Sequence, residues 1–353
     1  MSRETETMCK ATKAKAWFLL FRPWSYTATL VPFLVAAAPL VAYAGRTHRI
    51  YWGHWAGGIL VGLLFQATVN LLNTWGDERS GVDDVPGAIR TTPQVHDGLV
   101  SMRAVLAAAA TCATLACLGG LGLCFFAAPV EGGGTVWKIN WELLVAGFIG
   151  FLGSTNYSTG IKFKYRGLGV PFVSFLMGPL EIAVALMLLR PGLFANLAAP
   201  DLRTGIPMVV AILLFFSLPV ASHVGVIMHG NDMRDIPTDR AAGIVTMASW
   251  LGSKGALAYY WMAHLVPHAV CLAMAVLIGA TVLWTLGSVM LLPLLSLPLT
   301  ARTLFVATRT YHANPQSPPW RGLERASGGI HFVFGLLYAA ALYLLGSGMP
   351  IVE

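Results

Sequence analysis

Long apolar segments constrain this chain more than any other feature. Nine stretches of about 20 mostly apolar residues recur along the 353 residues, long enough to cross a bilayer as α-helices. Their apolar runs lack the alternation of a membrane barrel strand. Only 11% of the residues are charged, whereas soluble domains carry about 25%. We therefore predict an all-α integral membrane protein with nine transmembrane helices, at roughly 26–44, 53–72, 104–127, 141–158, 168–189, 206–228, 256–280, 282–300 and 328–347.

The distribution of basic residues predicts the orientation of these helices. If the N-terminus and the loops after the second, fourth, sixth and eighth segments share one face, that face holds 18 of the 23 Lys and Arg residues. Cytoplasmic loops carry such an excess, so we expect a cytoplasmic N-terminus. The net charge of +7 then reflects topology, and no basic binding fold suggests a nucleic-acid partner.

The rest of the chain offers little sign of a separate soluble domain. Residues 1–15 are polar, and we expect a disordered tail followed by one membrane domain over 16–353. The glycine-rich loop 128–140 is expected to be a flexible turn on the non-cytoplasmic face.

Polar residues at the end of the second apolar segment form the first candidate site. Asn73 and Asp77 are four residues apart and share one helix face. A glycine then permits a turn, so that Asp83 and Asp84 can fold back toward the same point. A solvated helix end is the alternative, but Asn70 and Asn73 lie inside the apolar stretch, where unpaired amides are costly.

A second acidic group follows the sixth apolar segment. Asn231, Asp235 and Asp239 recur every fourth residue as one helical stripe, with Arg234 and Arg240 beside them. An Asp/Arg surface helix would explain this group alone, but not the matching first group on the same predicted face. Carboxylates at a membrane boundary need a cation, and Mg²⁺ binds through few carboxylates plus substrate phosphates. The two groups together predict an enzyme that acts on a diphosphate.

Basic residues could neutralise such a diphosphate from the side opposite the metal. Lys162 and Lys164 lie in the loop after the fourth segment, and Arg22 and Arg90 are weaker candidates for the same work. Ordinary cytoplasmic charge is the alternative explanation for each of them.

Glu181 is an ionisable residue inside the fifth predicted span. Such a residue is a functional candidate, and a neutral packed glutamate is the alternative.

Several motifs resemble those of the UbiA-type intramembrane prenyltransferases. That family has two motifs, N-x-x-x-D-x-x-x-x-x-D and N-x-x-R-D-x-x-x-D, on its second and sixth helices. Here they correspond to Asn73, Asp77 and Asp83, and to Asn231, Arg234, Asp235 and Asp239. The segments 157–169 and 243–252 resemble the menaquinone branch of the family, which includes an animal UbiA-domain enzyme and the 1,4-dihydroxy-2-naphthoate prenyltransferases.

The resemblance implies a nine-helix bundle of UbiA type, Mg²⁺ as cofactor, and a set of site residues. The implied metal ligands are Asp77, Asp83, Asp235 and Asp239. The implied catalytic residues are Asp77, Asp235, Lys164 and Tyr157. The residues implied in substrate binding are Asn73, Asn231, Arg22, Arg90, Arg234 and Lys162.

The implied reaction moves a prenyl group from an allylic polyprenyl diphosphate to a dihydroxynaphthoate or naphthoquinol, as in menaquinone biosynthesis. Other acceptors stay open, namely 4-hydroxybenzoate, homogentisate or a glycerol phosphate. A multi-pass transporter with an ion site is the non-enzymatic alternative, although its carboxylates would be expected nearer the bilayer midplane. A regulatory scaffold role, as in the animal branch, could accompany catalysis.

Overall fold

The computed structural model describes residues 3–43, 49–80, 95, 98–129, 134–194 and 202–349. Its longer helices are α1 (Arg3–Phe21), α2 (Thr27–Tyr43), α3 (Trp52–Ser80), α5 (Met102–Leu123), α6 (Trp141–Asn156), α10 (Leu202–Ala241), α11 (Met247–Thr281), α13 (Leu297–Ala313) and α14 (Leu323–Gly348). Shorter helical elements are η1 (Pro23–Tyr26), η4 (Phe163–Tyr165), α7 (Gly169–Phe175), η5 (Leu176–Leu180), α8 (Glu181–Leu189), α12 (Trp284–Ser288) and η6 (Val289–Ser296). The strands are β1 (Phe125–Pro129) and β2 (Thr135–Ile139).

Each of the nine predicted segments overlaps a helix or a continuous run of helical elements, although the third, 104–127, ends in strand β1. Within the described part of the chain, seven helical segments are long and apolar enough to cross a membrane, which shows a multi-pass membrane protein. The nine-span count and the cytoplasmic N-terminus stay predictions. The fifth segment is a composite, because a π-helical turn (η5) with Pro179 inside it separates α7 from α8. Proline has no backbone N–H and therefore interrupts the regular hydrogen bonding of an α-helix. A π-helical turn is a local departure from that regular pattern.

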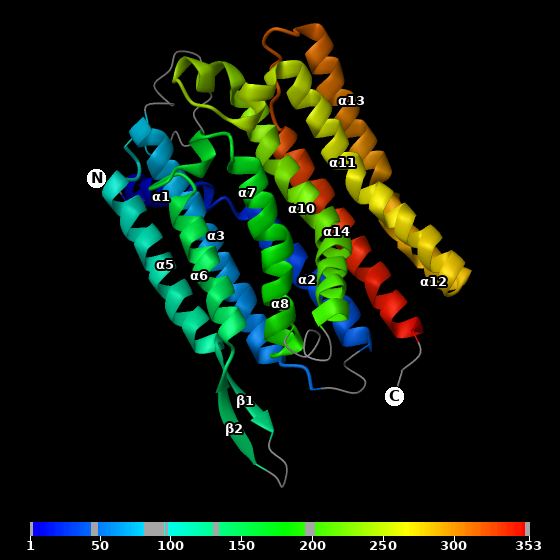
Figure 1. Cartoon of the computed structure of the whole chain (residues 1–353). Helices are drawn as coiled ribbons and strands as arrows, with labels where there is room; N and C mark the ends of the chain where they lie inside the picture. Colours follow the sequence, from blue (N-terminus) through cyan, green and yellow to red (C-terminus); the bar gives the residue numbers. More distant parts are fainter. Residues whose placement is uncertain are drawn as a thin grey trace.

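The helices run along a common direction and form one bundle (Figure 1). The C-terminal ends of α3 and α10 and the connection between α6 and α7 all lie at one end of the bundle, drawn uppermost in Figure 1. The hairpin of β1 and β2 projects from the opposite end. The two predicted acidic groups therefore share one end of the molecule.

The apolar core lies between the helices rather than on their outer faces. One cluster joins α2, α8 and α14, and its fully buried side chains include Phe33, Ile182, Phe334 and Tyr338. Outward-facing residues such as Phe148 remain exposed, as expected for helices surrounded by lipid.

The segment predicted as a flexible turn at 128–140 is a β-hairpin over its described residues. Phe125 pairs with Ile139 and Pro129 with Thr135 in an antiparallel register. The prediction was wrong here because three glycines dominated the pattern, while the β-branched and aromatic residues of Thr135–Ile139 favour a strand. At the N-terminus, α1 includes residues 3–15 of the predicted tail. The division of the chain at residue 16 stays a prediction.

Candidate active site

The end of α3 presents a buried pair of polar side chains. Asn73 and Asp77 are 7% and 5% exposed, although they lie in the last two turns of the helix. Lys164, from the connection between α6 and α7, reaches both of them. Its Nζ lies 2.6 Å from Asp77 Oδ1 and 2.9 Å from Asn73 Oδ1. The ammonium group thus partly neutralises a buried carboxylate.

A glycine lets the connection between α6 and α7 dock closely on α3. A Cβ atom at Gly76 would lie 2.9 Å from the Ser158 carbonyl oxygen and 3.2 Å from Tyr165 Oη. In this close packing the Tyr165 hydroxyl donates to Asp77 Oδ1 at 2.7 Å, on the same carboxylate oxygen that Lys164 contacts. The docking therefore fixes Lys164 and Tyr165 against Asp77.

The end of α10 presents a second set of carboxylates. Asp239 is 6% exposed and accepts a hydrogen bond from the Thr246 hydroxyl at 3.2 Å. Thr246 is also the N-cap of α11, where it and Ser249 form a reciprocal capping box. A short parallel bridge between Arg166 and Val245 joins this turn to the one that carries Lys164. The turn after α10 is therefore tied to the connection between α6 and α7, which contacts the end of α3 through Lys164.

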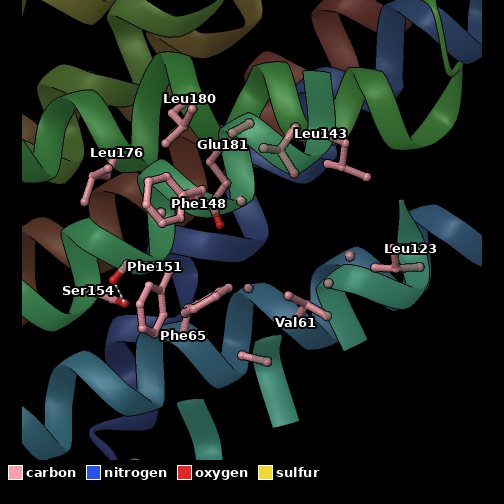
Figure 2. Close-up of a pocket in the computed structure, with 18 of the residues that line it drawn as sticks. Val61, Phe65, Leu123, Leu143, Phe148, Phe151, Ser154, Leu176, Leu180 and Glu181 are labelled. Carbon is pink, nitrogen blue, oxygen red and sulfur yellow. Dashed lines mark hydrogen bonds between the residues drawn. The ribbon is translucent and has the colours of Figure 1, made fainter. Parts of the chain in front are cut away.

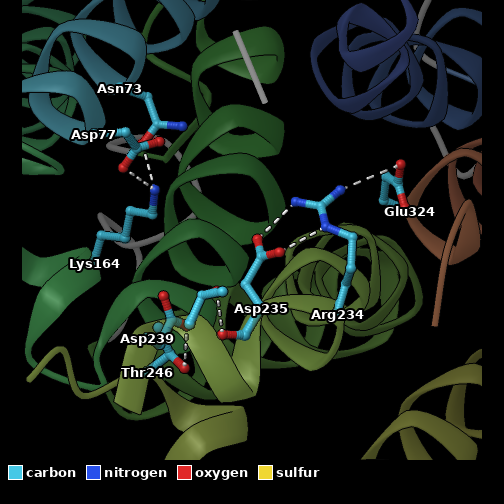
Figure 3. A network of polar contacts seen from close by, with 9 residues as sticks. Asn73, Asp77, Lys164, Arg234, Asp235, Asp239, Thr246 and Glu324 are labelled. Carbon is cyan, nitrogen blue, oxygen red and sulfur yellow. Dashed lines mark hydrogen bonds and ion pairs between the residues drawn. The ribbon is translucent and has the colours of Figure 1, made fainter. Parts of the chain in front are cut away.

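Arg234 lies between two carboxylates beside this set (Figure 3). It forms a two-pronged contact with Asp235, at 2.7 Å from Nε and 2.6 Å from Nη2. On its other side, Nη1 lies 3.8 Å from Glu324 Oε1 at the start of α14. Asp235 keeps 24% of its side chain exposed, so this pairing leaves its carboxylate accessible.

Asp77 at the end of α3 and the neighbouring Lys164 influence the pKa values of the carboxyl groups at the end of α10. Burial, together with the neighbouring Asp235, raises the pKa of Asp239 to about 7, and Asp77 contributes in the same direction. Burial and Asp239 also raise the pKa of Asp232 well above its ordinary value, while Lys164 opposes this. Both groups lie beyond the apolar part of α10. Lys164 thus offsets only part of the negative charge that α3 and α10 bring together, and a further cation would be favoured here.

A cavity of about 660 Å³ adjoins these residues. Its walls include predicted residues from four parts of the chain: Arg22, Asn73, Tyr157, Asn231 and Arg234. Tyr157 is 3% exposed and Asn231 is half-buried on the wall. Arg321 and Arg325 also line the cavity, so its wall carries four arginines and one acidic residue, Glu324. The arrangement can hold an anionic head group beside a large, mostly apolar space.

Some predicted residues do not join this group. Lys162 is exposed and does not line the cavity. Asp83 and Arg90 lie outside the described residues, so their predicted roles stay open. Asn70, to which the sequence assigned no role, lines the cavity, and its amide donates to the Phe21 carbonyl at 2.8 Å and to Ser25 Oγ at 3.0 Å. These bonds hold the turn that begins at Arg22.

Other residues of the site were not assigned a role from the sequence. Asp232 is 7% exposed and interacts with Asp239 and Lys164, yet it falls outside the every-fourth-residue stripe that the pattern emphasised. Glu324 reaches the site from the start of α14, distant in sequence, and Thr246 reaches it from the start of α11, seven residues after Asp239. Only the density of acidic residues around 231–239 could have indicated Asp232.

The donors fit a hard cation such as Mg²⁺. Asp77, Asp235, Asp239 and the Asn73 amide supply oxygen atoms, which are the ligands that Mg²⁺ prefers. Among the described residues, no three His, Cys, Asp or Glu side chains form a ready-made metal cage. This also suits Mg²⁺, which is commonly held by one or two carboxylates together with substrate phosphates.

A polytopic helical bundle with carboxylates from two helix ends beside a basic cavity has the features of an intramembrane transferase. Comparison with known proteins gives the same class. The chain belongs to the UbiA prenyltransferase family, whose model matches residues 29–333. It is therefore a prenyltransferase.

Curated relatives match nearly the whole chain. The UbiA prenyltransferase domain-containing protein 1 of Homo sapiens is 28% identical over 338 residues, covering 95% of this chain and 86% of the relative. A homologue from Drosophila melanogaster is 27% identical over 343 residues, covering 93% and 79%.

Solved structures share the fold at low sequence identity. A UbiA homologue from Archaeoglobus fulgidus, bound to GPP and Mg²⁺, aligns with a TM-score of 0.55 and 13% identity over 93% of this chain and 99% of its own. The apo structure of a UbiA homologue from Aeropyrum pernix K1 aligns with a TM-score of 0.52 and 17% identity over 91% and 97%. These likenesses confirm the UbiA-type fold.

Proposed function

We propose that this prenyltransferase carries out Mg²⁺-dependent transfer of a prenyl group from an allylic polyprenyl diphosphate to a naphthoate or naphthoquinol ring, a step of menaquinone biosynthesis. The observation that carries the proposal is the meeting of Asp77 on α3 with Asp239 on α10 around Lys164. The archaeal relative with the same fold binds GPP and Mg²⁺, which supports a prenyl diphosphate and Mg²⁺ here as well.

In this proposal Asp77, Asp235 and Asp239 hold Mg²⁺, and Asn73 and Asn231 orient the ligands around them. Asp83, outside the described residues, is the fourth proposed ligand. Bound Mg²⁺ would neutralise the diphosphate and so favour its departure.

Lys164 and the arginines of the cavity serve the leaving group. Lys164 forms an ion pair with Asp77 in the structure. Its flexible four-carbon stem allows the ammonium group to move toward a diphosphate bound next to that carboxylate. Arg22 and Arg234 line the same cavity and can add charge-assisted hydrogen bonds to phosphate oxygens. Breaking the allylic C–O bond leaves its electron pair on the diphosphate, which these cations stabilise.

The apolar cavity walls protect the allylic carbocation. Water would react with such a cation before the acceptor ring could, so the site must exclude water. The buried Tyr157 lines the cavity, and an aromatic face stabilises a neighbouring cation by about 0.5–2 kcal/mol. The electron-rich acceptor ring then attacks the cation, and loss of a ring proton restores aromaticity.

The naphthoate or naphthoquinol acceptor rests on the menaquinone-branch motifs in residues 157–169 and 243–252. The basic wall of Arg321 and Arg325 is compatible with an acceptor that carries a carboxylate. We place the site on the cytoplasmic side of the membrane, because the loops at this end contain most of the basic residues.

A product assay tests this function. Purified full-length protein in nanodiscs would receive Mg²⁺, geranylgeranyl diphosphate and each of three acceptors: 1,4-dihydroxy-2-naphthoate, menadiol and 4-hydroxybenzoate. We expect mass spectrometry to detect a prenylated naphthalene ring, and EDTA to prevent its formation. Prenylation of 4-hydroxybenzoate alone would contradict the acceptor, and undiminished turnover in EDTA would contradict the metal.

A further inference from the structure

A second cavity, of about 350 Å³, lies among α3, α5, α6 and α8 (Figure 2). It is lined largely by apolar side chains, among them Val61, Phe65 and Phe151. Its wall along α3 runs from Gly58 to Val69, a length of about 16 Å at the helical rise per residue. Gln66, Val69, Leu176 and Met177 belong to the walls of both cavities, so the two spaces adjoin one another. Asp77, Asp235 and Asp239 do not line the second cavity. The second cavity is therefore a neighbouring compartment rather than part of the carboxylate cluster.

One carboxyl group faces this apolar space. In Figure 2 the Glu181 side chain points from the start of α8 toward the cavity. Its Oε2 atom is buried and has no hydrogen-bond partner among the described residues. The Thr29 hydroxyl lies beside the carboxyl, but its oxygen also lacks a partner of good geometry. A buried polar group left in this state is costly, which indicates that something else completes its hydrogen bonding.

The cavity is accessible from the lipid-facing surface. Leu121 on α5 and Phe148 on α6 line it, and the same side chains are 51% and 60% exposed. Gly147 and Gly150, on the same face of α6, also line it, and a Cβ atom at either would meet no other atom within 4 Å. Flexible side chains and glycines therefore form the barrier between the cavity and the bilayer.

We propose that this cavity binds an uncharged membrane lipid with a hydroxyl or carbonyl group, whose oxygen hydrogen-bonds to Glu181. The apolar walls match a hydrocarbon body, and the Glu181 carboxyl can accept from a hydroxyl or, when protonated, donate to a carbonyl. A bare hydrocarbon, such as the tail of a prenyl donor, would cover Glu181 Oε2 and leave it unpaired. Two sources share the required chemistry: the prenylated ring released by the enzyme, and a lipid alcohol of the surrounding membrane.

A pair of probes that differ by one oxygen tests the proposal. Dodecanol and dodecane both match the length of the cavity, and native mass spectrometry of the full chain in nanodiscs would count the bound molecules. We expect dodecanol to bind about twofold to tenfold more tightly than dodecane, the range that the net contribution of one hydrogen bond supplies. Glu181→Met keeps the side-chain length and should remove this preference, whereas Glu142→Met, at the start of α6 and outside the cavity wall, should retain it.

Filling the space gives an independent test. Gly150→Leu places a side chain in the cavity and should lower dodecanol binding at least tenfold. Gly122→Leu is the matched control, because a Cβ atom there also meets no atom within 4 Å but Gly122 does not line the cavity. Equal binding of the two probes to the unmodified chain would overturn the proposal. So would a Gly150→Leu variant that binds dodecanol normally but rejects long prenyl diphosphates, since the cavity would then hold the donor tail.

The same measurement separates the two sources. Protein purified without substrates should carry a lipid alcohol if the membrane supplies the ligand. If the ligand is the product, the bound mass should appear only after turnover with a prenyl diphosphate and an acceptor. In either case Glu181→Met should lose the bound mass, and its retention by that variant would contradict the role of Glu181. These binding readouts do not depend on which acceptor the enzyme uses.

Discussion

Lys164 Nζ lies 2.6 Å from Asp77 Oδ1, although 87 residues separate the two along the chain. The contact joins the end of α3 to the connection between α6 and α7, and the same lysine also influences Asp239 at the end of α10. Three separate parts of the sequence therefore meet at one ammonium group. The pair keeps the cluster partly neutral, and Lys164 is close enough to act on an anion bound there.

Replacement of Lys164 tests its proposed role at the leaving group. Lys164→Met should lower prenyl transfer about 100-fold or more, since loss of one donor to a developing anion commonly has that effect. Lys162→Met is the matched control, because Lys162 is exposed, whereas Lys164 is partly buried against Asp77. We expect it to reduce the rate less than tenfold in the same assay. Equal losses in the two variants would show that general basic charge, rather than the Asp77 contact, matters.

The close packing at Gly76 gives a prediction about stability. Gly76→Ala puts a Cβ atom 2.9 Å from the Ser158 carbonyl oxygen, so the α6–α7 connection must move away from α3. Overpacking of this kind costs about 1–3 kcal/mol, and the movement should also disturb Lys164 and Tyr165. Thermal unfolding in detergent should show a lower Tm together with weaker transfer. Gly122→Ala, which meets open space, should leave both unchanged, and a Gly76→Ala protein with normal Tm and rate would contradict the described packing.

The raised pKa of Asp239 predicts a pH dependence of metal binding. Its folded value of about 7 exceeds the ordinary value of 3.8 because of burial and the neighbouring Asp235. Below about pH 7 a proton competes with Mg²⁺, so the apparent Mg²⁺ affinity should rise with pH up to that point and then level off. Asp239→Asn should remove this slope in a titration that follows Mg²⁺-induced changes in Tm. A slope that persists in this variant would assign the proton to another group.

The raised pKa of Asp239 also predicts how the stability of the metal-free protein depends on pH. Because the folded carboxyl holds its proton more tightly than the unfolded one, the folded state is favoured at low pH. Its stability should fall as pH rises from 3.8 to about 7. Added Mg²⁺ should restore the most stability above that range, where Asp239 is ionised. Thermal unfolding with and without Mg²⁺ would measure both trends.

The sequence predicted the positions of the helices well, because apolar length alone specifies a membrane span. It missed the β1–β2 hairpin, because the neighbouring glycines outweighed the strand-favouring residues of Thr135–Ile139. It also missed the π-helical turn at Leu176–Leu180, which contains Pro179. The pairing of Asn73 and Asp77 on one face followed from helix periodicity.

The partners of those residues did not follow from periodicity. The hydrogen bonds of Asp77 with Tyr165 and of Asp239 with Thr246 depend on how the loops dock at the end of the bundle. Asp232 lies next to the expected stripe, and only its burial toward Lys164 shows that it faces the site. Long-range docking of this kind has no signature in a single sequence, apart from the family motifs that these residues belong to.

Binding of an unreactive prenyl thiolodiphosphate tests most directly whether Asp77 on α3 and Asp239 on α10 bind the same metal–diphosphate unit. Its Mg²⁺-dependent affinity would be measured for the unmodified chain, for Asp77→Asn, for Asp239→Asn and for the double variant. If both carboxylates serve one bound unit, each single change should abolish most of the Mg²⁺-dependent affinity, and the double variant should lose little more. Purely additive losses, or full Mg²⁺-dependent binding in either single variant, would contradict the account.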